Sequence, residues 1–242
     1  MRKLLILSLL LPAATIAALA QDHQTNKKTL SRHLREVYNV VKTDWKIKDS
    51  TYSVINDAGF VVVKGNYVKG KKSGIWSYYD NNGTLVQQYD FDNDSLVSHD
   101  TDPASAVHTD YQIPQGVEDS TQLRAPYKIG GSEYGFYLLY DERDIPQPVK
   151  SASGRAEMTY VLTIDEKGRL ESYALLFAGE SFSDITERRS VRGLPEEALE
   201  YSAATIAGQP VRSKISYTIP LDINHVSVPG TNNIVTQHGT SN

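Results

Sequence analysis

Apolar and polar positions alternate most regularly between residues 156 and 164, which predicts a β-strand with one buried face. Four apolar side chains share that face: Met158, Tyr160, Leu162 and Ile164. Residues 165–168, Asp-Glu-Lys-Gly, have the composition of a tight turn, and residues 170–177 are again rich in apolar side chains. The pattern therefore predicts a β-hairpin. A further strand is predicted over residues 211–223, with its own apolar face.

Two helices are predicted around these strands. Gly130 and Gly131 interrupt the chain, Ser132 is a favourable N-cap, and apolar residues follow at helical spacing as far as Asp141. A second helix is predicted to be capped by Ser183 and to stop at residue 193, a glycine. The order helix, strand, strand, helix, strand predicts an α+β fold, in which three antiparallel strands carry two helices on one face.

The first half of the chain repeats itself with a period of 24 residues. Residues 51–70, TYSVINDAGFVVVKGNYVKG, align with residues 75–94, IWSYYDNNGTLVQQYDFDND. Each copy predicts a strand, a turn and a strand, because both turns contain Asn, Asp and Gly, which tolerate positive φ. Stacked hairpins of this kind predict an antiparallel sheet. The segment before them is predicted to be a short helix from Thr29 that runs into a strand near Val37.

The N-terminus has the pattern of an export signal. Basic Arg2 and Lys3 precede an apolar run over residues 4–20, which ends in Ala-Leu-Ala. We expect cleavage after Ala20 and a periplasmic or secreted protein, and the alternative is an uncleaved membrane anchor. The chain contains no cysteine, which excludes a disulfide framework, a thiolate metal site and a lipid attached to a cysteine.

Charge is distributed unevenly along the chain. Lysine and arginine are frequent from Lys27 to Lys72 and then absent until Arg124, while aspartates and glutamates accumulate between them. A basic first domain with a partner on its basic face is one interpretation, and two solvated faces is the plainer one. The formal net charge of -4 argues against nucleic acid as the main partner.

The predicted domain plan has five parts. Residues 1–20 form the signal peptide, residues 21–95 the hairpin-repeat domain, and residues 96–123 an acidic linker with at most one short strand, near Tyr111. Residues 124–224 form the second domain, and residues 225–242 form a flexible tail.

Several motifs of the second domain occur together and in order. They are APYKIGG at 125–131, the IDEKG turn at 164–168, Leu-Pro at 194–195, GQPV at 208–211 and YTIP at 217–220. In this order they resemble the C-terminal domain of TonB. The resemblance implies a protein-interaction module that adds a partner's extended segment to the edge of its sheet, along the last strand. The implied partner-binding residues are Arg212, Lys214, Tyr217 and Ile219.

Residues 52–94 resemble a degenerate bacterial MORN-type repeat, whose core has glycines at 65, 70, 74 and 83 and a run of aromatic residues. Trp76, Tyr78 and Tyr79 are candidates for an aromatic surface that binds a glycan or a protein, and the plainer interpretation places such rings in the core.

Chemistry-bearing motifs are missing from the sequence. No histidines pair at metal-ligand spacing, and the Asp90-x-Asp92-x-Asp94 segment lacks the glycine and glutamate of a calcium loop. There is no nucleophile elbow or phosphate-binding loop, so we expect neither an enzyme nor a cofactor.

The function predicted from the sequence is a non-catalytic cell-envelope module that binds a partner by strand addition. The expected partner is a protein, such as an outer-membrane receptor or another envelope protein, and a membrane only if the N-terminal segment stays uncleaved. One alternative is a membrane-anchored TonB-type energy transducer for outer-membrane transport. Another is recognition of a glycan or a protein through the aromatic hairpin repeat.

Overall fold

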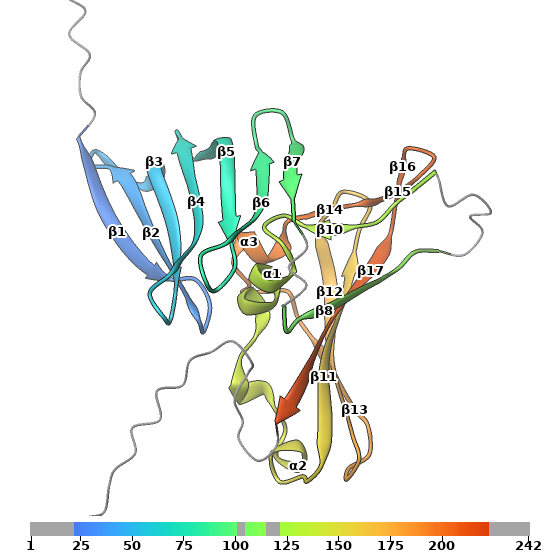
Figure 1. Ribbon diagram of the computed structural model, residues 1–242. Coiled ribbons are helices and arrows are strands. Elements are labelled where there is room, and N and C mark those ends of the chain that lie inside the picture. Colours follow the sequence, from blue (N-terminus) through green and yellow to red (C-terminus); the bar gives the residue numbers. More distant parts are fainter. Residues whose placement is uncertain (1–21, 101–104, 115–121, 223–242) are drawn as a thin grey trace, which may run out of the picture.

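The computed structural model describes residues 22–100, 105–114 and 122–222. The predicted signal peptide and the predicted tail from residue 225 lie outside these ranges. The described residues are mostly β, with 58% of them in strands and 11% in helices. Two antiparallel sheets stand side by side, and the short helices α1 (Ser132–Leu139) and α3 (Glu196–Leu199) lie between them (Figure 1).

The first sheet has seven strands in chain order, each joined to the next by a short turn. They are β1 (His23–Thr29), β2 (Leu34–Val41), β3 (Asp44–Asn56), β4 (Val61–Val68), β5 (Lys71–Tyr79), β6 (Leu85–Asp90) and β7 (Ser95–His99). The two predicted hairpins are confirmed as β3–β4 and β5–β6. The predicted helix from Thr29 is wrong, because this segment forms β1, a turn and β2, where the valines of 37–41 suit a pleated surface.

One face of the seven-stranded sheet is packed with aromatic rings. Tyr52, Trp76 and Tyr78 are each at most 2% exposed, and the Tyr52 and Trp76 rings lie 5.0 Å apart. Trp76 lies against Gly65 on the neighbouring strand, where a Cβ atom would be 2.2 Å from Cδ2 of the indole. Glycine at this position therefore makes room for the indole.

The second sheet has five strands in the order β13-β12-β11-β17-β8. They are β8 (His108–Gln112), β11 (Arg155–Ile164), β12 (Leu170–Gly179), β13 (Ile185–Arg189) and β17 (Ser213–Asp222). The predicted hairpin is confirmed as β11–β12, and the predicted last strand as β17. The apolar face of β11 is fully buried at Met158, Tyr160, Leu162 and Ile164.

Two small sheets lie beside the five-stranded sheet. One pairs β10 (Tyr127–Lys128) with β14 (Tyr201–Ser202). The other joins β9 (Leu123–Arg124), β15 (Ala204–Ile206) and β16 (Gln209–Val211).

The predicted α+β fold class is wrong. The second domain was expected to have three antiparallel strands and two helices, whereas its main sheet has five strands. The helices of the described residues are short: α1, α3, the 3-10 turn η2 (Glu142–Asp144) and α2 (Gln147–Lys150). The predicted first helix is present as α1, but Ser132 is its first residue and not its N-cap, because the N-cap is Gly131 and no side chain caps the helix.

The predicted second helix is replaced by β13. Ile185, Glu187 and Arg189 alternate with exposed residues and pair with β12, so this segment has a period of two. The arginines and the glutamate of this segment were equally compatible with a solvated helix face. Pairing with β12 makes this segment a strand, and this pairing cannot be predicted from the sequence of the segment alone.

The two sheets share one continuous hydrophobic core, to which both contribute buried residues. Polar contacts cross between them as well. The Tyr52 hydroxyl of β3 donates to Glu197 of α3 at 3.1 Å, and Lys72 of β5 forms an ion pair with Glu200. The Tyr78 and Tyr134 rings, from β5 and α1, lie 5.8 Å apart. Helices α1 and α3 therefore connect the seven-stranded sheet to the five-stranded sheet.

Candidate functional site

The strand expected to offer a free edge, β17, is an inner strand of its sheet. It pairs along its whole length with β11, and on its other side Lys214–Thr218 pair with β8 in the order Lys214↔Gln112 to Thr218↔His108. β8 comes from the predicted acidic linker, which was expected to contain one short strand near Tyr111. The sequence motifs did not indicate which strand it would join.

The four candidate partner-binding residues divide into two kinds. Tyr217 and Ile219 are 0% exposed and face the core, so their side chains cannot reach a partner that pairs with this strand. Lys214 is exposed, and exposed Arg212 donates to Glu171 at 2.7 Å. Only Lys214 and Arg212 are therefore available to contact another molecule.

β8 is held mainly through its backbone. All five of its residues are exposed, and Tyr111, opposite Ile215, is 53% exposed. Its one ion pair among the described residues joins His108 to Asp110 at 3.1 Å, and both side chains point into solvent. Since apolar burial is the main source of cohesion in a fold, β8 itself is weakly held, and its nearest apolar anchor is Val107, the core residue directly before it.

Unpaired backbone remains on both sides of the five-stranded sheet. Among the described residues, the outer side of β8 has no strand partner, and neither do residues 219–222 of β17 on the side where β8 ends. At the opposite edge β13 is likewise unpaired on its outer side. This second edge carries charges of both signs, and Arg189 lies 2.5 Å from Glu187 and 3.4 Å from Asp144. Charged side chains of this kind discourage a further strand.

The aromatic candidates of the repeat lie mostly inside the protein. Trp76 is 1% exposed and its indole N–H donates to the carbonyl of Asn66 at 3.2 Å, while Tyr78 is 2% exposed. Tyr79 points to the opposite face and is half-buried. The three rings therefore do not form a common surface, and two of them belong to the core.

A buried polar cluster lies at the junction of the two sheets, and no sequence motif predicted it. Lys128 is 2% exposed, and its ammonium donates to the carbonyls of Ile129, Glu197 and Glu200 at 3.1, 2.6 and 2.7 Å. Burial lowers the pKa of Lys128 to about 7, against the opposing attraction of Glu200. Through these hydrogen bonds, Lys128 links β10 to the C-terminal end of α3.

Gln87 of β6 completes this junction. It is 0% exposed, its carbonyl oxygen accepts the N–H of Gly130 at 2.5 Å, and its amide donates to the carbonyl of Lys128 at 3.2 Å. The Gln87 amide satisfies buried backbone groups of the Gly130-Gly131 turn, so it fixes the position of this turn against the seven-stranded sheet. An alternating strand pattern gives no indication that a glutamine faces inward.

Within the described ranges, no group of three or more His, Cys, Asp or Glu side chains is arranged to hold a metal ion. None of the helices in those ranges is long and apolar enough to cross a membrane. No family model, curated protein or solved structure matches this chain.

Proposed function

We propose that this protein is a non-catalytic interaction module of the bacterial cell envelope. It takes an extended segment of a partner protein into its five-stranded sheet, beside β17, in the place that β8 occupies. The export signal and the ordered TonB-like motifs of residues 125–220 support the location and the mode of binding.

The observation that carries this proposal is the contrast between β8 and its neighbour. β17 is anchored by fully buried Ile215, Tyr217 and Ile219, whereas every side chain of β8 is exposed. A strand held by backbone hydrogen bonds exchanges at little cost for another strand that makes the same bonds. A partner strand with a larger apolar side chain at the position of Thr109, opposite buried Tyr217, gains burial that β8 lacks.

Selectivity in this arrangement comes from the exposed face of the sheet. Lys214 faces outward from β17, so an acidic side chain on the incoming strand, at the position of Gln112, would lie opposite it. Cross-strand pairs of opposite charge contribute roughly 0.2–1 kcal/mol each, which tunes affinity without determining it.

The test links β8 covalently to β17 and measures whether a peptide can still bind beside β17. Because the chain has no cysteine, Asp110→Cys with Ser216→Cys places one disulfide between paired residues of β8 and β17. The probe is a labelled peptide with the sequence of residues 106–113, AVHTDYQI, followed by fluorescence anisotropy. Binding should disappear in the oxidised variant and return on reduction.

Two further variants make this result decisive. Thr159→Cys with Thr218→Cys links β11 to β17 instead and should leave peptide binding unchanged. Thr109→Pro with Asp110→Pro weakens β8, because adjacent residues of a strand direct their N–H groups to opposite sides and one of the two faces β17. This variant should bind the peptide most tightly. If it binds no peptide, or if the locked protein binds as well as the control, strand exchange at β17 is wrong.

A further inference from the structure

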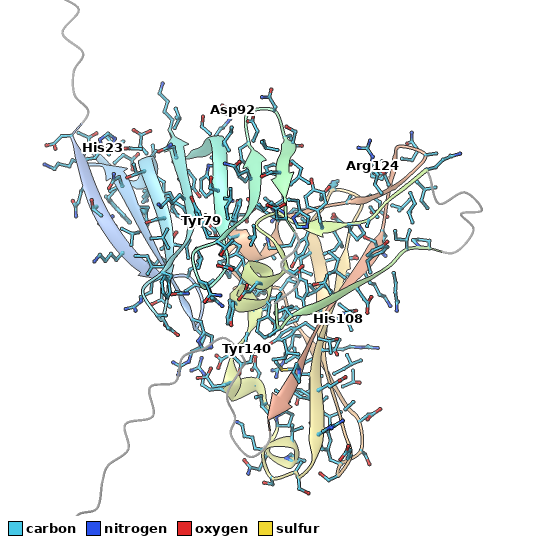
Figure 2. All side chains as sticks on the ribbon, in the orientation of Figure 1. His23, Tyr79, Asp92, His108, Arg124 and Tyr140 are labelled. Atoms are coloured by element: carbon cyan, nitrogen blue, oxygen red, sulfur yellow. The ribbon has the colours of Figure 1, made fainter. Side chains whose placement is uncertain are left out.

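The outer face of the seven-stranded sheet is the side turned away from α1 and α3. Side chains on the inner face contact the helices, as Tyr52 and Tyr78 do, so the residues that alternate with them face away. Figure 2 shows the sheet with His23 on its first strand, Tyr79 near its centre and Asp92 on the hairpin near its far edge. No described segment packs over this outer face.

One row of side chains crosses the outer face through all seven strands. The pairing register aligns Lys27, Val37, Ser53, Lys64, Ser77, Gln88 and Ser98, one from each of β1 to β7. With strands about 4.8 Å apart, this outer row is about 29 Å long. None of its members is buried.

The outer row follows from the 24-residue repeat. Ser53 and Ser77 occupy the same position in the two copies, as do Lys64 and Gln88. Each copy of the repeat therefore places one serine hydroxyl in the outer row, from Ser53 and from Ser77. Gln88 donates to the Ser77 hydroxyl at 3.2 Å, within the row.

Unpaired positive charge gathers on the same face. Lys27, Arg35, Lys64 and Lys71 are exposed, and none of them forms an ion pair with another described residue. The Lys64 ammonium lies 5.6 Å from the centre of the Tyr79 ring.

Carboxylates occupy the margins of this face. Asp90 of β6 lies opposite Ile75 of β5, and Asp92 in the following turn accepts a hydrogen bond from the Ser73 hydroxyl. Asp49 lies 2.9 Å from His23. In a chain of net charge -4, the region from β1 to β5 is thus a local concentration of free cations.

We propose that this outer face binds an anionic polysaccharide. Lys27, Arg35 and Lys64 neutralise its acidic groups, and Ser53 and Ser77 hydrogen-bond its hydroxyl groups. The cations at β1 and β4 are three strands apart, about 14 Å along the row, so they match charges spaced along a polymer rather than one compact anion.

The chemistry between the cations favours a polysaccharide over other polyanions. The hydroxyl and amide side chains of the outer row can both donate and accept hydrogen bonds, as a hydroxyl-rich ligand requires. An acidic helix would need an apolar stripe to dock against, and a membrane would need apolar side chains to insert between the cations. Within the outer row, Val37 is the one apolar residue between Lys27 and Lys64, whereas Ile55 and Val61 lie in the neighbouring row that holds Arg35. The hydroxyl groups of the outer row favour a polysaccharide, and the test below therefore includes lipid vesicles.

The experiment is affinity electrophoresis of the full chain in native gels that contain polygalacturonate, neutral dextran or poly-L-glutamate. We expect retardation by polygalacturonate only. The variant Lys27→Gln, Arg35→Gln, Lys64→Gln should weaken this binding at least tenfold. A matched variant, Lys150→Gln, Lys167→Gln, Arg188→Gln, removes the same charge from exposed positions elsewhere and should bind as the unaltered protein does.

A second substitution separates hydrogen bonding from charge. Ser53→Val with Ser77→Val keeps all cations and suits a β-strand, and it should weaken polygalacturonate binding severalfold. The proposal is overturned if the unaltered protein is not retarded, or if both charge variants lose binding equally. Equal retardation by poly-L-glutamate, or stronger binding to anionic lipid vesicles in a sedimentation assay, would instead assign the face to an acidic protein or a membrane.

Discussion

Gly65 lies directly beneath the Trp76 side chain, where an added Cβ atom would meet the indole at 2.2 Å. Gly65→Ala should therefore force the indole out of place and lower the free energy of unfolding by about 1–3 kcal/mol. Urea denaturation followed by tryptophan fluorescence measures this loss. Ser77→Ala, on the opposite face of the same sheet, is the control and should change stability by less than about 0.5 kcal/mol. An unchanged midpoint for Gly65→Ala would contradict the packing described here.

Lys128 predicts a pH dependence of stability. Burial lowers its pKa from 10.5 to about 7 in the folded protein, so between these values the unfolded chain holds a proton that the folded protein has lost. Stability rises with pH wherever the unfolded state binds more protons. The cost of burying the charged ammonium is complete below pH 7 and falls as pH rises.

The comparison protein for this prediction is Lys128→Met. The free energy of unfolding of the unaltered protein, relative to this variant, should increase from pH 7 towards pH 10, by at most about 1.4 kcal/mol per unit. Urea titrations at pH 6, 7.5 and 9 measure the difference. Lys150→Met, at an exposed site, should show no such trend. Parallel pH profiles for the unaltered protein and Lys128→Met would show that the lysine keeps its charge throughout.

At the level of elements, the same turn closes a hairpin in each sheet. The Asp80 carboxylate accepts the N–H groups of Asn82 and Thr84 at 2.8 and 2.7 Å. The Asp165 carboxylate accepts those of Lys167 and Arg169 at 2.9 and 2.7 Å. An aspartate at the first position of the turn thus satisfies two donors that the hairpin leaves unpaired.

Asp165→Ala should destabilise the protein by about 1–2 kcal/mol, because both N–H groups lose their acceptor. Asp165→Asn retains one acceptor oxygen and should lose less. Thermal unfolding followed by circular dichroism compares the two variants. Equal losses would mean that the charge, and not the hydrogen bonds, holds the turn.

Elements that depend on local signals could be predicted from the sequence, and those that depend on distant partners could not. The hairpins β3–β4, β5–β6 and β11–β12 combine alternation with turn residues a few positions apart. β13 was mistaken for a helix because five residues with two apparent periods are settled only by pairing with β12. The position of β8 beside β17 joins residues about a hundred positions apart, which no local pattern specifies.

The candidate site follows the same rule. Alternation along β17 already places Tyr217 and Ile219 on the apolar face, so their burial could have been predicted from the sequence. Their proposed contact with a partner came from the family resemblance. Lys128 and Gln87 are buried polar residues in segments that look like exposed strand, and only the docking of the two sheets makes them structural.

For the whole molecule, the shared core predicts that the two sheets unfold together. Both tryptophans, Trp45 and Trp76, lie in the seven-stranded sheet, so their fluorescence reports on that sheet alone. Leu162→Ala leaves a cavity in the five-stranded sheet and should cost about 2–5 kcal/mol. We expect the tryptophan transition to shift to lower urea together with the far-ultraviolet signal.

Lys167→Ala, at an exposed turn, serves as the control and should leave both transitions in place. If Leu162→Ala shifts only the circular dichroism signal and leaves the tryptophan transition unchanged, the sheets unfold independently. The contacts of Tyr52 and Lys72 with α3 would then contribute little to cohesion.

The inner position of β17 determines the order in which the protein can assemble. Neighbouring strands of the seven-stranded sheet are also neighbours in the chain, so that sheet can form hairpin by hairpin as the chain is delivered from its N-terminus. The five-stranded sheet cannot do so, because β17 separates β11 from β8 and is the last of its strands to be delivered. Until β17 arrives, β8 has no strand to pair with and one edge of β11 remains unpaired. This interval is the point at which a chaperone would be needed.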